Sequence, residues 1–361
     1  MDRRSRNRAV LARQLLLDRV TLAPLRAVER LVGMQAQTPR SPYTALWSRL
    51  RDFDPMSLSQ LIATRRAVRI ALMRSTIHLV SAADALLLRP LMAPIIMREL
   101  TVPNWRVPLE GLDLSAVAVR ARRLLEEQPR TPGQLGAALA QTWPEREPRA
   151  LAHAARSLLP LVQIPPRGLW DRSGATTLST AEQWLDATLV SDASWDGVAL
   201  RYLAAFGPAT AADLVTWCRV TGLAEVIARL RPRLRVLHDE DGRELFDLPR
   251  APRPPAATPA QPRFLPDFDN LLLSHADRNH VFADDHRSIL QSSNGVLPGT
   301  LLVDGFVVGA WTIERDGAAA RVLIRSLETI PVSHHEAIRA EGRGLLTLLA
   351  PQAERSEVVL R

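Results

Sequence analysis

Apolar residues recur at helical spacing in three successive stretches between residues 198 and 233. Gly207-Pro208 ends the first stretch, and Gly222 ends the second. Thr210 and Asp213 have the spacing of a capping box, which places the start of the second helix after Thr210. The sequence therefore predicts three short helices here, the first over 198–206 and the third over 223–233.

Two strands are predicted directly after the third helix. Residues 234–237 and 244–248 alternate in polarity on either side of Asp241-Gly242, a dipeptide typical of a type I′ hairpin turn. Three helices followed by a hairpin is the order of elements in winged-helix domains. The third helix of such a domain usually enters a groove of DNA, and the hairpin flanks the phosphate backbone.

The same plan recurs upstream, between residues 114 and 180. Helices are predicted over 114–128, from Thr131-Pro132 onward and over 148–159, and a short hairpin follows between residues 164 and 177. The spacing of the two copies is too long for a solenoid repeat. Within the first hundred residues the pattern predicts helices at 8–18, 24–34, 41–51 and 57–64, and strands at 68–73 and 76–80.

The pattern changes after a Pro-rich linker, RAPRPPAATPAQPR at 250–263, which we expect to be extended and semi-rigid. Strands are predicted beyond it at 301–303, 306–313, 321–326 and 358–360, with a helix at 333–349. We expect a helix-rich α+β chain whose C-terminal part packs back on the modules. The expected parts are a first winged-helix module at 1–110, a second at 111–195, a third at 196–250, the linker at 251–263, and an α/β part at 264–361.

The composition is that of an ordinary globular protein of 361 residues, with 47% hydrophobic and 23% charged residues. All 46 basic residues are arginine, since the sequence contains no lysine. The absence of lysine excludes a P-loop lysine, a pyridoxal phosphate Schiff base and a lysine-dependent β-lyase. Cys218 is the single cysteine, which excludes an internal disulfide and a Cys-ligated iron–sulfur cluster.

The net charge of +8 favours an anionic partner, with nucleic acid first and acidic lipid second. A GC-rich genome that encodes Arg throughout explains the charge equally well. The N-terminal residues MDRRSRNRAV lack the apolar core of a signal peptide, and no run of about 18 apolar residues exists. We therefore expect a cytoplasmic protein without a membrane span.

Common catalytic motifs such as GxSxG, HExxH and GxGxxG are absent. His275, His280 and His286 lie near aspartates, but their spacing matches no standard metal site, so we favour hydrogen-bonded histidines and expect no metal and no cofactor. The nearby aspartates could supply a general base, although capping and Arg pairing are favoured over that role. These aspartates are Asp267, Asp269, Asp277, Asp284 and Asp285.

Gln35-Ala36-Gln37 lies between an apolar helix and Thr38-Pro39. Residues two positions apart cannot share one face of a helix. At a helix end or in an extended turn, however, both amides can converge on one ligand. The pattern by itself also occurs in loops without any function.

Six segments together resemble the AlkZ/YcaQ-like winged-helix DNA glycosylases, and the resemblance covers most of the chain. VGMQAQTPRSPYTALWSRL at 32–50 includes the Gln-apolar-Gln catalytic motif of that family, and MRSTIHLV at 73–80 is similar to its Arg-x-Thr-x-His segment, with Ser75 where Gly is commoner. The remaining segments are LARQLLL at 11–17, RYLAAFGPATAADLVTW at 201–217, FLPDFDNLLLSHADR at 264–278 and LLVDGFVVGAWTI at 301–313.

Gln37 is the residue that distinguishes two branches of the family, because the other branch has Asp at this position. The branch with Gln is similar to enzymes that unhook interstrand cross-links and protect antibiotic producers. The resemblance implies three winged helices curved in a C shape around a concave basic channel. It also implies hydrolysis of the N-glycosidic bond of N7-alkylated purines in double-stranded DNA, without a cofactor.

The resemblance assigns the catalytic role to Gln35 and Gln37, and we expect His78 and Thr76 to support them. Alkylation at N7 gives the base a positive charge, so the base leaves as a neutral molecule and needs no general acid. Two amides can orient a water and stabilise the cationic sugar. A cross-linked base is tethered to both strands, so we expect no deep base-shaped pocket at the two glutamines. Without lysine the enzyme is expected to be monofunctional and to leave an abasic site.

Phosphate contacts are expected from arginines close to these motifs, namely Arg13, Arg40, Arg74, Arg278 and Arg325. Trp47 and Trp217 fit core faces. The hairpin at Asp304-Gly305 or the one at Asp316-Gly317 could probe the minor groove, and the sequence does not choose between them. We expect a monomer.

Two other functions remain compatible with the sequence. The modules alone fit a non-catalytic DNA-binding regulator or damage sensor equally well. A nuclease is a further option, but the sequence has no paired metal carboxylates of recognisable spacing to support it.

Overall fold

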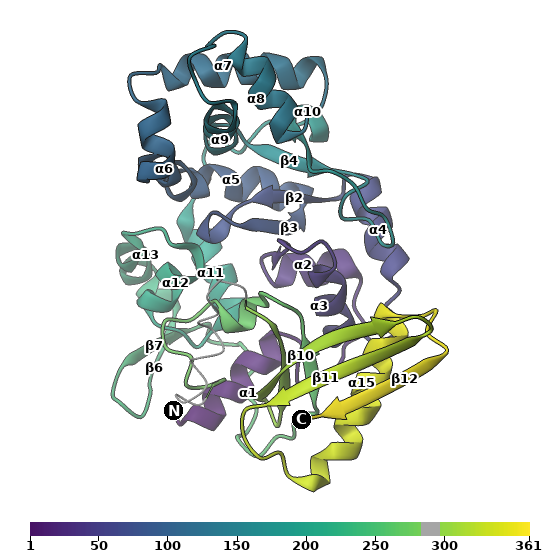
Figure 1. Cartoon of the computed structure of the whole chain (residues 1–361). Coiled ribbons are helices and arrows are strands. Elements are labelled where there is room, and N and C mark those ends of the chain that lie inside the picture. The colour runs from purple at the N-terminus through teal and green to yellow at the C-terminus, as the bar shows by residue number, and fades with distance from the viewer. Residues whose placement is uncertain (283–296) are drawn as a thin grey trace.

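The computed structural model describes residues 1–282 and 297–361. It is an α+β structure in which helices predominate, as the pattern predicts, and Figure 1 shows three groups of helices and a separate C-terminal sheet. His286, Asp284 and Asp285 lie outside the described residues. In the part of the chain that is described, no helix is long and apolar enough to cross a membrane.

The segment expected to form the first module contains the four helices and two strands that the sequence predicts, with shifted ends. Its elements are α1 (Arg3–Arg13), α2 (Pro24–Arg30), α3 (Ser41–Arg49), α4 (Pro55–Ala63), β2 (Ala67–Ala71) and β3 (Ile77–Ser81). α1 begins five residues earlier than expected because the Asp2 side chain caps it by accepting from the Ser5 amide. A short strand that the pattern does not reveal, β1 (Met34–Gln35), pairs with β3.

The second module follows α5 (Ala82–Met97) and α6 (Pro103–Arg106). Its predicted elements are present as α7 (Leu114–Glu127), α8 (Pro132–Ala140), α9 (Pro148–Leu158), β4 (Leu161–Ile164) and β5 (Thr177–Thr180), followed by the short α10 (Ala181–Leu185). Thr131 and Gln134 form a complete capping box at the start of α8. β2 pairs with β4, so the hairpins of the first two modules form one sheet with the order β1-β3-β2-β4-β5.

The third module has the predicted helices α11 (Trp195–Phe206), α12 (Ala211–Cys218) and α13 (Leu223–Leu230), then β6 (Arg235–His238) and β7 (Glu244–Asp247). Thr210 and Asp213 form the expected capping box. The predicted type I′ turn is wrong, because only Gly242 of the dipeptide has a positive φ. The Asp239 carboxylate accepts from the backbone of Asp241 and Arg243, and this local bonding produces a longer loop.

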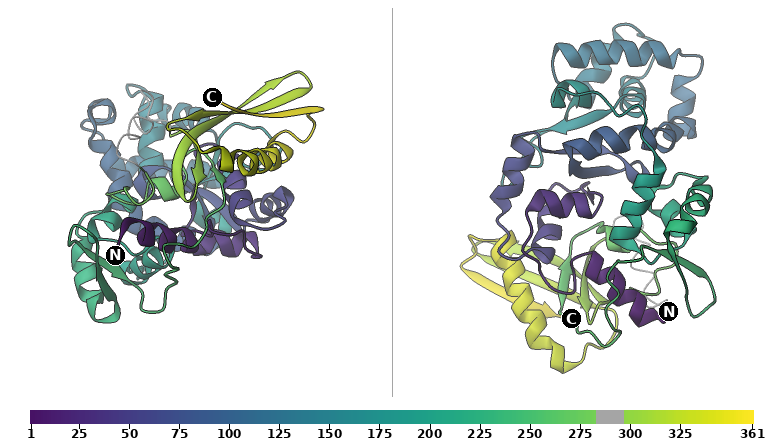
Figure 2. Two further views of the ribbon diagram at one scale, coloured as in Figure 1. Left: turned by 90° about the horizontal axis from the view of Figure 1, so that it is seen from below. Right: turned by 180° about the vertical axis from the view of Figure 1, so that it is seen from behind.

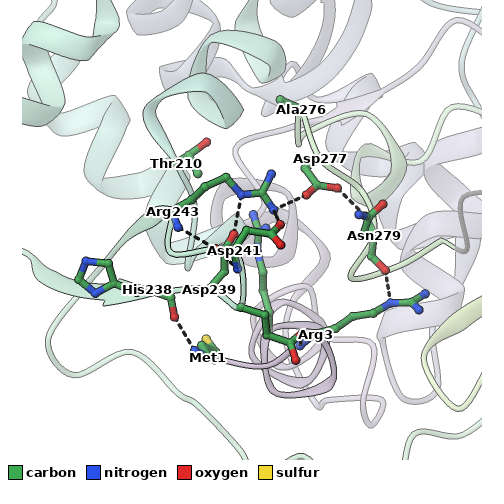
Figure 3. A network of polar contacts seen from close by, with 12 residues as sticks. Met1, Arg3, Thr210, His238, Asp239, Asp241, Arg243, Ala276, Asp277 and Asn279 are labelled. Atoms are coloured by element: carbon green, nitrogen blue, oxygen red, sulfur yellow. Dashed lines mark hydrogen bonds and ion pairs between the residues drawn. The ribbon is translucent and has the colours of Figure 1, made fainter.

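The loop between β6 and β7 is held against α1 and the segment around residue 277, as Figure 3 shows. The Arg243 guanidinium bonds to Asp239, Asp241 and Asp277. The Met1 ammonium donates to the His238 carbonyl, and Arg3 donates to the Asn279 carbonyl. The hairpin of the third module is therefore held by contacts with the N-terminal residues and the segment around residue 277.

The C-terminal part is a five-stranded sheet with the order β12-β11-β10-β9-β8. Its elements are β8 (Arg263–Leu265), β9 (Gly299–Val303), β10 (Phe306–Asp316), β11 (Ala319–Ser326), α15 (His335–Leu349) and β12 (Arg355–Leu360). α15 lies along one face of the sheet and leads to β12, which pairs in parallel with β11. Arg49 of α3 pairs with Asp269 through both terminal nitrogens, each at 2.9 Å, so this part packs on the first module.

α1 connects distant parts of the chain, and Figure 2 shows it between the third module and the C-terminal sheet. Carbonyl groups of the Pro-rich linker accept hydrogen bonds from its arginines: Arg4 donates to Ala256 at 2.9 Å, and Arg8 donates to Thr258 at 2.6 Å. Asn7 donates to the Gly305 carbonyl at 2.7 Å. The linker is thus anchored on α1, but it is not extended throughout as expected, because it turns where the Thr258 amide donates to the Pro255 carbonyl at 3.0 Å.

Candidate active site

Gln35 and Gln37 converge as the extended-turn interpretation predicts. Gln35 ends β1, and the Ala36 amide donates to the Ile77 carbonyl at 2.7 Å, which keeps the chain extended through the motif. Side chains two positions apart in an extended chain point to the same side. The Gln35 Nε2 accordingly donates to the Gln37 Oε1 at 3.0 Å. Gln35 is 6% exposed, whereas Gln37 is exposed to solvent.

Arg74 fixes the orientation of both amides. Its Nη2 donates to the Gln35 Oε1 at 2.7 Å. A guanidinium can only donate, so the oxygen of Gln35 must face Arg74 and the nitrogen must face Gln37. The carbonyl oxygen of Gln37 therefore accepts from Gln35, and it keeps a second lone pair for another donor.

The Arg74 guanidinium joins three parts of the chain behind the glutamines. Nη1 donates to the Trp217 carbonyl of α12 at 2.6 Å, and Nη2 donates to the Asn270 Oδ1 at 3.0 Å. Asn270 in turn donates to the Gly33 carbonyl at 3.1 Å, one residue before β1. Burial and, to a smaller extent, the charges of Arg219 and Arg278 lower the pKa of Arg74 to about 9, so Arg74 is still charged at neutral pH.

The backbone at Arg74 and Ser75 adopts a conformation that favours glycine. Arg74 and Ser75 have φ values of 57° and 58°, in the left-handed region that glycine adopts most easily. A glycine at position 75, which is commoner in the family, suits this turn. Ser75 adopts the same conformation here.

His78 is a neutral histidine that contacts Arg74 in this cluster. It is fully buried, its Nδ1 donates to the Thr76 carbonyl at 3.0 Å, and its Nε2 lies 3.4 Å from the Arg74 Nη2. A backbone carbonyl can only accept, so the proton is on Nδ1 and the lone pair of Nε2 faces Arg74. Burial and the charge of Arg74 lower the pKa of His78 to about 3. The Thr76 hydroxyl donates to the Met73 carbonyl at 3.0 Å and does not reach the amides.

The cavity between Gln35, Gly33 and Asn270 has a volume of about 10 Å³. That volume holds about one water molecule. Among the described residues, this cavity is too small for a purine, and Gln37 is the exposed amide of the pair.

Two of the three described aspartates of the Asp cluster are engaged in capping or in pairing with arginine. Asp269 caps a 3₁₀ turn at Leu271 and pairs with Arg49, Asp277 pairs with Arg243, and Asp267 accepts from the Ser41 hydroxyl. These contacts support the structural interpretation for Asp269 and Asp277.

The expected DNA contact by Arg13 is wrong. Arg13 is fully buried, and its two terminal nitrogens bond to the buried Asp247 at 2.7 and 2.9 Å. It also donates to the Leu203 carbonyl at 3.0 Å. Arg74 is half-buried, and its guanidinium donates to the Gln35 and Asn270 side chains and to the Trp217 carbonyl, which holds it behind the glutamines.

The other expected phosphate contacts have exposed or half-buried side chains. Arg40 is exposed, lies 3.2 Å from Asp171 and has its guanidinium over the Trp170 ring at 5.5 Å. Arg325 is exposed on β11. Arg278 is half-buried, and its Nε donates to the His275 carbonyl at 3.3 Å. Trp217 is fully buried as predicted, and Trp47 is half-buried against the C-terminal core.

The two C-terminal hairpins differ in how their turns are placed. Asp304 and Gly305 form a tight turn with φ of 48° and 82°, but Arg8 donates to the Asp304 carbonyl at 3.0 Å and Asn7 covers Gly305. The turn between β10 and β11 is exposed, and a Cβ added at Gly317 would meet nothing within 4 Å. Of the two turns, the one at 316–317 is accessible.

Arg69 is a buried residue beneath the motif that the sequence reasoning missed. Its Nη2 donates to the Ala36 carbonyl at 2.7 Å, and its side chain packs against Gly168 in the long loop of the second module. Burial, together with the charge of Arg167, lowers the pKa of Arg69 to about 10. An arginine among the apolar residues of a buried strand was the available signal.

A family model described as DNA glycosylase AlkZ-like matches residues 28–348 of the chain. The chain belongs to the AlkZ-like DNA glycosylase family. As a member of that family it is a DNA glycosylase, and DNA is its partner. Among solved structures, the DNA glycosylase AlkZ of Streptomyces sahachiroi is similar with a TM-score of 0.80 at 21% sequence identity, and 99% of each chain is covered. No curated protein sequence matches this chain.

Proposed function

We propose that this DNA glycosylase hydrolyses the N-glycosidic bond of N7-alkylated purines in double-stranded DNA, including bulky adducts and interstrand cross-links. The observation that carries the proposal is the pair of hydrogen-bonded amides at Gln35 and Gln37, of which only Gln37 is exposed. The cavity of about 10 Å³ beside Gln35 also supports a site that acts without engulfing a base.

Gln37 is the amide that meets the DNA in this proposal. Its Oε1 has one lone pair held by Gln35, and the other accepts a hydrogen bond from the attacking water. The same oxygen carries partial negative charge toward the cationic sugar that forms as the base leaves. Because N7 alkylation already makes the base a good leaving group, correct placement of water supplies the remaining assistance.

The groups behind the amides orient them without exchanging protons. His78 stays neutral at physiological pH because its pKa is about 3. Arg74 stays charged and donates to Gln35. Weak catalytic groups of this kind favour cationic, damaged bases over normal ones, which need protonation before they leave.

The absence of lysine supports a monofunctional reaction that ends at the abasic site. We further infer that Arg40, Arg278 and Arg325 contribute phosphate contacts and that the accessible turn between β10 and β11 approaches the minor groove. Gln37 supports the cross-link branch of the family. The reaction would serve DNA repair, and self-protection in a cell that makes a DNA-alkylating antibiotic.

The test is single-turnover excision by the Gln37→Ala variant on duplexes containing 7-methylguanine, a bulky N7 adduct or an interstrand cross-link. We expect base release to fall about 100-fold or more with little change in duplex affinity. Gln60→Ala, at an exposed glutamine of α4, is the matched control and should behave as the unmodified enzyme.

Heat or alkali after incubation converts abasic sites to strand breaks and reports bond cleavage directly. A non-catalytic DNA-binding regulator would give no such breaks with any of the three duplexes. Full activity in a variant with alanine at both Gln35 and Gln37 would remove the proposal. Strand nicking in step with base release would remove its monofunctional part.

A further inference from the structure

The second module carries a basic surface that has no part in the glutamine cluster. α9, the third helix of this module, lies in the upper part of Figure 1 and is buried along most of its length. Arg149 and Arg156 are nevertheless exposed, two turns apart, and His153 lies between them. Residues at this spacing share one face of a helix. These three residues are called the α9 face below.

The protein does not neutralise the arginines of the α9 face. Within residues 1–282 and 297–361, neither Arg149 nor Arg156 forms an ion pair or a side-chain hydrogen bond. The Arg149 guanidinium lies 5.2 Å from the Trp105 ring centroid. Burial, together with the charges of Arg156 and Arg149, lowers the pKa of His153 to about 4. The imidazole between the two arginines is therefore neutral at pH 7, and the positive charge of the face is that of the guanidinium groups.

The elements beside α9 add to this positive charge. Arg98 lies in the 3₁₀ turn η2 (Arg98–Thr101), Arg106 ends α6, and both elements pack against α9. Both arginines are exposed, and neither has an ion pair in the described parts of the chain. Glu99 of η2 and Glu147, the N-cap residue of α9, are the acidic residues of the same elements. The exposed arginines thus outnumber the acidic residues here, and the surface favours an anionic partner.

The corresponding helix of the third module has no such free charge. Arg229 of α13 pairs with Asp196, and Arg231, which directly follows that helix, pairs with Glu244. The hairpin after it is held through Arg243, which bonds to three aspartates. Third helices of winged-helix modules are expected at DNA. Of these two third helices, α9 is the one whose arginines are available to phosphate groups.

A hollow beside the α9 face suits a sugar–phosphate backbone. Its volume is about 560 Å³, and it is formed where α6, the start of α8 and α9 meet. Pro132 and Leu178 contribute apolar wall, and Arg149 and Arg156 are among the other lining residues. A DNA backbone alternates anionic phosphates with less polar deoxyribose rings. Cationic groups beside apolar wall therefore match both of its components.

We propose that the α9 face binds the sugar–phosphate backbone of duplex DNA, as a contact separate from the two glutamines. Arg149 and Arg156 each donate to phosphate oxygens, and the release of counterions from the DNA favours binding. Contacts of this kind orient a protein on a duplex without reading its sequence, so this one serves undamaged DNA as well as lesions. The inference rests on DNA as the partner of the family and not on the bond that the enzyme breaks.

Binding of an undamaged duplex over a series of salt concentrations tests the contact independently of base release. Arg149→Gln combined with Arg156→Gln should weaken binding about tenfold or more at about 0.1 M salt and should lower the slope of log affinity against log salt by about 2. Single-turnover excision at saturating enzyme should be retained. Arg123→Gln combined with Arg339→Gln is the matched control, because it removes the same charge at exposed positions of α7 and α15 and should leave the slope unchanged. Thermal unfolding verifies that each variant is folded.

Glu99→Gln provides a change of the opposite sign. It removes the acidic residue that lines the hollow, so the affinity for duplex should rise about two- to threefold at the same salt concentration. A purely structural role of this surface would not produce stronger binding to DNA.

Three results would overturn the proposal. The first is an unchanged salt slope in the folded Arg149/Arg156 variant. The second is an equal loss in the Arg123/Arg339 control, which would show that net charge alone is responsible. The third is retained duplex binding together with lost binding to vesicles of acidic phospholipid, which would assign the α9 face to a membrane surface. If the salt effect occurs but no duplex loses a base, the proposed reaction fails and the α9 contact stands.

Discussion

One buried and one half-buried arginine hold the candidate active site in place. Arg69 donates to the carbonyl between the two glutamines, and Arg74 donates to the amide of Gln35. A guanidinium offers five directed donors from one side chain, so it can orient several acceptors at once. In a chain without lysine, nearness of an arginine to a motif therefore does not indicate a DNA contact.

Arg74→Met tests the positioning role of this residue. Without the guanidinium the Gln35 amide is free to rotate, so we expect single-turnover excision to fall about 10- to 100-fold. Duplex affinity and its dependence on salt should change little. Arg74→Lys keeps a charge but lacks the planar fork, so an intermediate rate is expected.

Arg40→Met is the matched comparison because this arginine is exposed. It should weaken duplex binding and reduce the slope of log affinity against log salt by about 1, with the rate at saturating enzyme retained. If Arg74→Met instead shows that salt effect and keeps its rate, the residue contacts phosphate as the sequence first indicated.

The sequence predicted the convergence of the glutamines because the period of an extended chain is two residues. It could not predict the partners of the arginines. Asp247, which pairs with Arg13, and Asn270, which holds Arg74, are distant in sequence from the residues that they contact. Such pairings depend on how the modules fold together, for which the local pattern carries no signal.

At the level of elements, turns too could be predicted only in part from the local sequence. Asp304-Gly305 has positive φ at both residues, whereas Asp241-Gly242, where the sequence predicted this, does not, because the Asp239 side chain competes for the backbone. The helices and their capping boxes were predictable since their signals are local. Pairing of β2 with β4 across two modules was not, because strand partners leave no mark in either strand alone.

The two C-terminal turns predict different costs for the same substitution. Gly305→Ala places a Cβ 2.5 Å from the Asn7 Oδ1 at a φ of 82°, so we expect a loss of about 2–4 kcal/mol in the free energy of unfolding. Gly317→Ala has only the positive φ of 54° and open space, so a loss of about 1 kcal/mol is expected. Urea unfolding of both variants measures the difference, and equal losses would contradict the clamped turn.

At the scale of the whole molecule, the segment 274–280 packs beside α1 and contains two buried histidines. His275 and His280 lie there with ring centroids 4.4 Å apart, at most 2% exposed. The His275 Nε2 donates to the Phe206 carbonyl at 2.9 Å, while neither ring nitrogen of His280 has a partner within the described residues. Burial lowers the pKa of His275 to about 4 and that of His280 well below its usual value, with His275 and Arg6 adding to the effect on His280.

This buried pair predicts acid sensitivity. A histidine whose pKa is lower in the folded than in the unfolded chain takes up a proton on unfolding. It therefore lowers the free energy of unfolding progressively as the pH falls below about 6.5, the pKa in the unfolded chain. One such group lowers the free energy of unfolding by about 2 kcal/mol at pH 5, because each pKa unit is worth about 1.4 kcal/mol.

His280→Leu removes a titrating group and two unsatisfied nitrogens. The free energy of unfolding of the variant, relative to that of the unmodified protein, should therefore rise by about 1–2 kcal/mol as the pH falls from 7 to 5. Urea unfolding at both pH values measures this change. His238→Leu, at an exposed position, is the control. If His280→Leu raised the free energy of unfolding by the same amount at both pH values, His280 would not titrate on unfolding.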